Sequence, residues 1–262
     1  MNLSQSDIDR AAADLLQAEE TREQIGLLSL RHPGLTLDDA YAIQAAQMAQ
    51  KLASGRTIAG WKIGLTSKVM QRALNIDTPD SGVLYDDMVF DHGATVPKGR
   101  FIQPRVEAEI AFVTKSDLSG KVTAEQVMAA TDYVQPALEV IDSRFSGFKF
   151  DLESVIADNS SSARYVPGGR MIRPDALDLR TVGVVLEHNG DIAQIGAGAE
   201  VLGHPAEAIA MLVGVLDDMG EVLPAGSFVM AGAITAAVAV KPGDTITARF
   251  YEMGSITVTF TE

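Results

Sequence analysis

Apolar residues recur at helical spacing along the first fifty positions of the chain. Ser4 precedes Asp7 by three residues, as in a capping box, and the apolar positions that follow keep to one helical face. Thr36 and Asp39 repeat this arrangement before a second periodic stretch that reaches about Leu52. The N-terminal part of the chain is therefore predicted to be helical.

From Ile58 onward, short apolar segments alternate with Gly, Pro and Asp turns, which is typical of strands rather than of a helical bundle. The clearest strands are 245–251 and 256–260, separated by a turn at 252–254. Strict alternation predicts an antiparallel hairpin with one buried face. That face consists of Ile246, Ala248, Phe250, Ile256, Val258 and Phe260.

Two further helices are predicted within the β-rich part. One begins after a capping box formed by Thr123 and Gln126, and the other begins at Pro205 with His204 as its N-cap. Together the patterns predict an α+β fold. We expect a boundary near residues 95–101, which gives a helical α/β lobe over 1–98 and a β-rich core over 99–262.

Composition narrows the function. The 262 residues are 47% hydrophobic and carry a formal charge of −14, which argues against binding to nucleic acid or to an anionic membrane. No cysteine is present, so thiolate catalysis and Cys-ligated zinc are excluded. The first residues lack the pattern of a signal peptide, and no apolar run is long enough to span a bilayer. We therefore expect a cytoplasmic protein, in which an anionic substrate needs local cations or a metal.

Three glutamates are the strongest candidates for a metal site. On a strand after Pro104, Glu107 and Glu109 point to the same face, with Cα atoms roughly 6.6 Å apart at ~3.3 Å per residue. Glu139 lies in an apolar stretch, where an unpaired carboxylate is costly. Three carboxylates and water suit Mg²⁺ or Mn²⁺. The alternative is that Glu107 and Glu109 form the solvent-facing side of an edge strand.

Basic and polar residues near these acids could act on a substrate. Lys62 lies between Gly60 and Gly64 on a predicted strand, where burial would lower its pKa toward general acid–base use. Alternatively, its ammonium group reaches water. Arg105 and Arg144 could bind a dianion or pair with neighbouring acids. The polar segment 157–162 could orient a substrate or form an ordinary turn.

One glycine-rich stretch could indicate a phosphate loop. It runs over residues 196–200, between a predicted strand and the helix that begins at Pro205. A third glycine at the required spacing is missing, and no βαβ unit surrounds the stretch. A nucleotide-binding oxidoreductase is therefore a weak alternative.

The chain also resembles a known family, the hydratases and decarboxylases of the meta-cleavage pathways, within the fumarylacetoacetase-like superfamily. The resemblance extends from about residue 20 to the C-terminus and rests on several motifs in combination. These are Lys62-Ile63-Gly64-Leu65-Thr66-Ser67, Pro104-Arg105-Val106-Glu107-Ala108-Glu109, Leu138-Glu139-Val140-Ile141-Asp142-Ser143-Arg144, Ala157-Asp158-Asn159 and Gly196-Ala197-Gly198-Ala199.

The resemblance implies a mixed β-sheet roll with a smaller N-terminal α/β lobe. It implies Mg²⁺ or Mn²⁺ on the three glutamates, an active-site lysine at Lys62, and a structural or active-site role for the glycine-rich stretch. Segments 148–152, 161–165 and 232–240 are similar to the decarboxylase branch, whereas Asp80 is typical of the hydratases.

We therefore predict loss of CO₂ from a six-carbon 2-oxo dicarboxylate, with a hydratase as the alternative. Predicted catalytic residues are Lys62, Asp80 and Arg144, and predicted substrate-binding residues are Arg105, Ser161, Arg164 and Thr235. A homo-oligomer and association with a sister hydratase are also expected. A non-catalytic subunit that stabilises such a partner would have no need of the three glutamates.

Overall fold

The computed structural model of the chain describes residues 2–68, 71 and 79–262. The helices are α1 (Gln5–Thr21), α2 (Leu28–Arg31), α3 (Leu37–Ala53), α5 (Ala124–Ala130), α6 (Leu152–Ala157) and α7 (Pro205–Asp218). The strands are β1 (Ile58–Gly64), β2 (Asp80–Tyr85), β3 (Thr95–Pro97), β4 (Arg105–Thr114), β5 (Thr131–Ile141), β6 (Ser162–Pro167), β7 (Gly183–His188), β8 (Asp191–Ala197), β9 (Phe228–Ala233), β10 (Val238–Ala239), β11 (Thr245–Phe250) and β12 (Gly254–Thr261). In these ranges no helix could cross a membrane.

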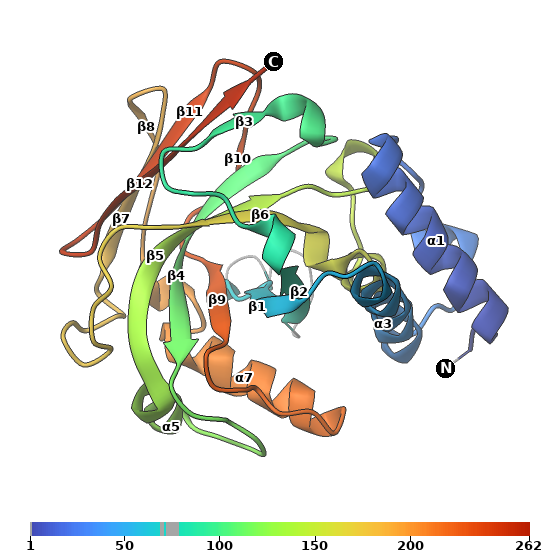
Figure 1. Ribbon diagram of the computed structural model, residues 1–262, viewed down its shortest axis with the longest axis horizontal. Helices are drawn as coiled ribbons and strands as arrows, with labels where there is room; N and C mark the ends of the chain where they lie inside the picture. The colour runs from blue at the N-terminus through green and yellow to red at the C-terminus, as the bar shows by residue number, and fades with distance from the viewer. Residues whose placement is uncertain (1, 69–70, 72–78) are drawn as a thin grey trace.

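Two curled sheets form the centre of the molecule (Figure 1). The larger has the order β2-β1-β9-β4-β5-β6, with β10 paired to β4, and the smaller has the order β3-β12-β11-β7-β8. Pairing is parallel between β1 and β9 and between β3 and β12, and the other paired strands are antiparallel. The predicted α+β class with mixed sheets is confirmed.

One large apolar core fills the space between the elements of this roll. The predicted C-terminal hairpin is confirmed as β11 and β12, and its six alternating apolar residues are all buried. From β4 the core receives Val106, Ala108 and Ile110. Because side chains alternate along a strand, the residues between them point to the opposite, inner side of the curled sheet.

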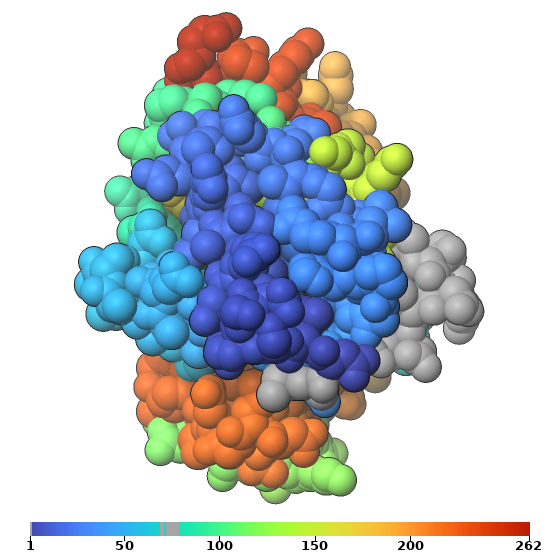
Figure 2. Space-filling model, turned by 90° about the vertical axis from the view of Figure 1, so that its right-hand side faces the viewer, coloured from blue at the N-terminus to red at the C-terminus, as the bar shows by residue number. Residues whose placement is uncertain are grey.

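The N-terminal helices form a second, smaller core. Helices α1 and α3 lie side by side along one flank of the roll (Figures 1 and 2), and α3 packs on α6. The predicted capping box of α3 is present between Thr36 and Asp39, and the later boxes and caps at Thr123 and His204 are also confirmed. The Ser4 side chain caps α1 as expected.

The predicted boundary at residue 98 does not follow the architecture. Strands β1 and β2, both before residue 98, pair within the same sheet as β9 and β4, and β3 pairs with the C-terminal strand β12. The sequence could not reveal these pairings because the partners are far apart along the chain. The change from helical lobe to roll lies between Ala53 and Ile58.

Candidate metal centre and active site

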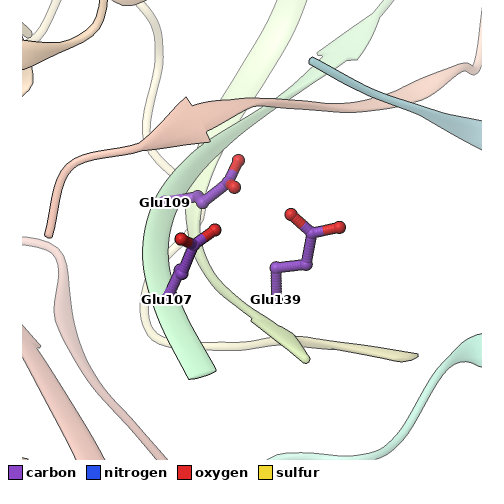
Figure 3. Close-up of side chains that lie close together, drawn as sticks. All are labelled: Glu107, Glu109 and Glu139. Atoms are coloured by element: carbon purple, nitrogen blue, oxygen red, sulfur yellow. The ribbon is translucent and has the colours of Figure 1, made fainter. Parts of the chain in front are cut away.

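Strand pairing brings the three predicted glutamates together. In the β4–β5 register Glu107 lies opposite Glu139, and Glu109 lies two residues further along β4 on the same face. One carboxylate oxygen from each residue lies within 4.8 Å of the other two. Figure 3 shows the carboxylates of Glu107 and Glu109 pointing from one strand toward that of Glu139 on the next. The interpretation as a solvent-facing edge strand is therefore wrong, because β4 is flanked by β5 and β9.

This cluster of like charges is strongly shielded from water. The side chains of Glu109 and Glu139 are buried, and that of Glu107 is partly buried. Burial, reinforced by the charge of Glu139, raises the pKa of Glu107 to about 7. Burial also raises the pKa of Glu109 well above its usual value, again with a contribution from Glu139. Without a cation the protein must therefore protonate part of the cluster.

The donor set fits a hard divalent cation. Glu109 Oε1 and Glu139 Oε1 are buried and accept no hydrogen bond from the described residues, although the Lys62 ammonium lies 3.4 Å from Glu139 Oε1. Such oxygens are costly unless something else binds them. Three converging carboxylates satisfy the preference of Mg²⁺ or Mn²⁺ for oxygen ligands and leave positions for water or a chelating substrate.

A bulge in β9 fixes the orientation of Glu109. The β4–β9 register shifts between Glu109 and Ala111, and Gly232 in the bulge has a φ of +112°. This conformation lets the Gly232 N–H donate to Glu109 Oε2 at 2.7 Å. A Cβ at Gly232 would lie 2.2 Å from Thr66 Oγ1, so only glycine fits this position.

Lys62 enters the same inner space from β1. Its Nζ lies 3.4 Å from Glu139 Oε1, and its side chain is buried. Burial alone would lower the pKa of Lys62, but Glu139 and the other surrounding carboxylates raise it above the usual value. The predicted lowering of this pKa is therefore wrong in direction, and the alternative of an ammonium reaching water is also wrong. The sequence could not show that four acids surround the lysine.

Asp80 lies on the same inner face, because it pairs with Gly64 two residues beyond Lys62 on β1. Its carboxyl group is buried, and burial raises its pKa although Lys62 and Ser160 oppose the rise. Asp80 and Lys62 therefore share one face of the sheet and interact electrostatically, and a catalytic role for either stays a prediction.

Two of the predicted substrate-binding residues lie close to the glutamates. Arg105 precedes Glu107 on the same face of β4, helps to oppose the rise in the pKa of Glu107, and has its guanidinium 4.0 Å from the centre of the Phe148 ring. Thr235 accepts the Ala108 N–H at 3.2 Å, between two of the acidic residues. Both are placed to shape the site, and their contact with substrate stays a prediction.

Arg144 has its donors bound within the protein. Its guanidinium pairs with the Asp158 side chain and donates to backbone carbonyls that include Asp142 at 2.7 Å. The predicted substrate-binding residue Ser161 lies on the same segment, with its hydroxyl 3.4 Å from Asp158 Oδ2. These contacts favour a role for Arg144 in holding the 158–162 segment rather than in touching substrate.

Arg164 projects away from the glutamates. In the β5–β6 register Tyr165 lies opposite Glu139, whereas Arg164 lies opposite Val140, so Arg164 belongs to the other face of the sheet. Its guanidinium lies 5.9 Å from the ring centre of Phe90. Sequence similarity alone could not show on which face of β6 Arg164 lies. A role for Arg164 in substrate binding stays a prediction, and its position on β6 does not favour that role.

The glycine-rich stretch serves close packing. A Cβ at Gly196 would lie 2.2 Å from the Ile234 carbonyl oxygen, and one at Gly198 would lie 1.9 Å from that of Leu179. These glycines therefore let β8 and the turn after it approach neighbouring backbone. They form no strand–loop–helix phosphate cradle, because β8 pairs antiparallel at the edge of its sheet.

Three contributors to the site were not predicted individually, although two of them, Ser160 and Gly232, lie in the segments 157–162 and 232–240 that the sequence analysis named. Gly232 binds Glu109, Ser160 acts on Asp80, and Tyr41 reaches Ser81 and the neighbourhood of Asp80 from helix α3. Burial raises the pKa of Tyr41, and the charge of Asp80 adds to the rise. The glycine between β-like residues was a visible signal of a bulge, whereas nothing local indicates that a helical tyrosine reaches the sheet.

Affinity for Mg²⁺ should rise steeply between pH 6 and 8. Protons and the cation compete for the same oxygens, and a Glu107 with a pKa of about 7 is mostly protonated at the lower pH and mostly ionised at the higher one. Calorimetric titration should show about a ten-fold or greater gain in affinity, with proton release on binding. An affinity that is constant over this range would contradict the assignment of these residues as ligands.

Comparison with known proteins places the chain among characterised enzymes. It is 45% identical to a 4-oxalocrotonate decarboxylase of Pseudomonas sp., over 98% of each chain. It is 43% identical to a 2-oxo-hept-4-ene-1,7-dioate hydratase of Escherichia coli, over 95% of this chain and 96% of the relative. The structure of 4-oxalocrotonate decarboxylase from Pseudomonas putida G7 with magnesium and adipate superposes with a TM-score of 0.97, at 44% identity and 99% coverage of both chains.

Residues 57–261 match the family model described as fumarylacetoacetate (FAA) hydrolase, C-terminal. This range begins at the first strand of the roll and ends at its last, so it includes every glutamate of the metal centre. The chain belongs to the fumarylacetoacetate hydrolase family.

Proposed function

We propose that the protein is a Mg²⁺-dependent decarboxylase of 2-oxo-3-hexenedioate (4-oxalocrotonate), releasing CO₂ and 2-hydroxypenta-2,4-dienoate. The observation that carries the proposal is the buried cluster of Glu107, Glu109 and Glu139 with the ammonium of Lys62 beside it. The identity of 45% to a 4-oxalocrotonate decarboxylase over nearly the full length supports this choice of substrate.

The reaction needs no organic cofactor, because the substrate carries its own electron sink. The bond between C5 and C6 breaks, C6 leaves as CO₂, and the electron pair is delocalised through the C3–C4 alkene onto the 2-oxo oxygen. Mg²⁺ held by the three glutamates would supply a Lewis acid for that oxygen. In metal-assisted catalysis such an effect stabilises the transition state by roughly several kcal/mol.

The residues of the chain bind the dianionic substrate and supply the proton that the dienolate takes up. Lys62 is an ammonium at neutral pH because its pKa is raised, so it attracts an anion into an otherwise acidic chamber and is a proton donor beside the glutamates. Arg105 lies on the same face as Glu107, where its guanidinium can bind the carboxylate that departs. Because Lys62 and the neighbouring glutamates Glu109 and Glu139 are buried, electrostatic interactions in the site are stronger than they would be in water.

A hydratase that adds water to 2-hydroxypenta-2,4-dienoate is the second candidate. The observation that favours it is Asp80, a buried carboxyl beside Lys62 that could activate or deliver water. The E. coli relative, at 43% identity, is a hydratase, so overall identity separates the two reactions only weakly. Assays with both substrates distinguish them directly.

Glu107→Gln should lower CO₂ release from 2-oxo-3-hexenedioate by about 100-fold or more, since it removes one ligand and one charge from the centre. Chelator should abolish the activity of the wild-type protein, and Mg²⁺ or Mn²⁺ should restore it. Glu125→Gln is the matched control, because this exposed glutamate lies in the first turn of α5. Full metal-dependent turnover in Glu107→Gln would overturn the proposal, and hydration without CO₂ release would select the hydratase.

We also propose that the protein forms a homo-oligomer. The outward side of the smaller sheet exposes Ile192, Ile195 and Tyr251 on or beside strands β8 and β11, around a shallow apolar groove. The charged residues beside this groove, Arg249 and Glu187, pair with each other, so two copies of a chain with a net charge of −14 can approach here with little repulsion. A cytoplasmic location and association with a sister hydratase stay predictions.

Light scattering should therefore give a mass that is a multiple of the 27.8 kDa chain. Replacing Ile195 by Lys should shift the protein toward the monomer, because a buried interface cannot accommodate the added charge. The control is the replacement of Leu30 by Lys. Leu30 is also exposed, but it lies on α2, away from this sheet. A monomeric wild-type protein would contradict the proposal.

A further inference from the structure

The turn between α6 and β6 has an unusual backbone. Asn159, Ser160 and Ser161 have φ angles of 50°, 54° and 55°, and all three are buried. None is glycine, and the left-handed region is unfavourable for residues with a Cβ. Three successive residues in this region persist only where the surrounding structure holds them there.

Contacts on both sides hold the turn in place. The Asn159 side chain accepts the Val83 N–H at 2.8 Å and donates to the Val83 carbonyl at 2.9 Å, which fastens the turn to β2. On the other side, the buried pair between Asp158 and Arg144 fastens it to the end of β5. The turn is therefore tied to the strand that begins with Asp80.

The result is a close approach of two side chains above Gly64. A Cβ built on Gly64 would lie 2.1 Å from Asp80 Oδ1 and 2.8 Å from Ser160 Oγ, so both groups occupy the space that any larger residue would need. Gly64 follows Lys62 on the same face of β1. The left-handed turn thus brings a serine hydroxyl and the Asp80 carboxyl group together on the face of β1 that also carries Lys62.

We propose that Ser160 is a positioning residue, whose hydroxyl donates to the Asp80 carboxyl group and holds it toward Lys62. The interaction opposes the rise in the pKa of Asp80 that burial causes, and Lys62 acts in the same direction. Asp80 Oδ1 is buried and accepts no hydrogen bond from the described residues, whereas the carboxyl group as a whole also interacts with the backbone N–H groups of Asp80 and Gly64. The Lys62 ammonium lies 3.4 Å from Glu139 Oε1 and also interacts electrostatically with Asp80, so a fixed Asp80 carboxyl group helps to orient the protons of the ammonium.

Two substitutions at Ser160 separate positioning from folding. Ser160→Ala and Ser160→Gly both remove the hydroxyl, but glycine also relieves the left-handed conformation and should raise the unfolding midpoint relative to alanine. The kinetic readout rests on the proposed function. We expect kcat for CO₂ release to fall by about ten-fold in both variants, with KM and Mg²⁺ affinity nearly unchanged. Arg22→Gly is the control, because Arg22 is exposed and has a φ of 61° at the end of α1. It should keep wild-type kcat.

A kcat near the wild-type value in both Ser160 variants would overturn the proposal. So would a kcat that recovers in Ser160→Gly together with stability, since a purely structural role predicts that outcome. If the wild-type protein releases no CO₂, the proposed function fails. The positioning role is then tested by the ¹³C shift of the Asp80 carboxyl carbon in the Mg²⁺-loaded protein. Assigned by its absence in Asp80→Asn, this signal should move in Ser160→Ala and stay constant in Arg22→Gly. An unmoved signal in Ser160→Ala would refute the positioning role.

Discussion

The repulsion among three buried carboxylates is the constraint on which the site depends. Glu107, Glu109 and Glu139 converge within 4.8 Å in a place with little access to water, where burial raises their pKa values. Such a cluster is stable only when protons, cations or hydrogen bonds compensate it. Lys62 and the Gly232 N–H provide part of this compensation, and a divalent cation would provide the rest.

The fold supports the cluster through features that are individually simple. Antiparallel pairing of β4 and β5 sets Glu107 opposite Glu139, and the bulge in β9 turns a backbone donor toward Glu109. The apolar residues that alternate with the glutamates anchor β4 in the core. Rigid strands thus carry the charged groups, while the left-handed turn at 159–161 adds a restraint on Asp80 from outside the sheet.

The sequence predicted those parts of the structure that depend on local pattern. Capping residues located the helices at Thr36, Thr123 and Pro205, and alternation located the C-terminal hairpin, because these signals lie within a few residues of the elements they specify. The Glu-x-Glu spacing predicted that two acids share a face. Spacing alone did not predict that Glu139 approaches these two acids. That part of the prediction rested on the family resemblance.

Features that depend on distant pairing could not be predicted in the same way. The direction of the pKa shift of Lys62 depends on acids from three other strands, and the side of the sheet on which Arg164 lies depends on the β5–β6 register. The sequence left open whether Arg144 binds a dianion or pairs with an acid, because its partner Asp158 is fourteen residues away and reaches it only through a buried turn. Long-range register, rather than residue type, therefore decides which charged residues face the substrate.

The most direct test is the position of a bound cation. Diffraction from crystals grown with Mn²⁺, collected at a wavelength where manganese scatters anomalously, would locate the ion independently of any assay. We predict one strong peak, about 2.2 Å from a carboxylate oxygen of each of Glu107, Glu109 and Glu139. An ordered site without a peak at saturating Mn²⁺, or a peak bound by other residues, would contradict the account.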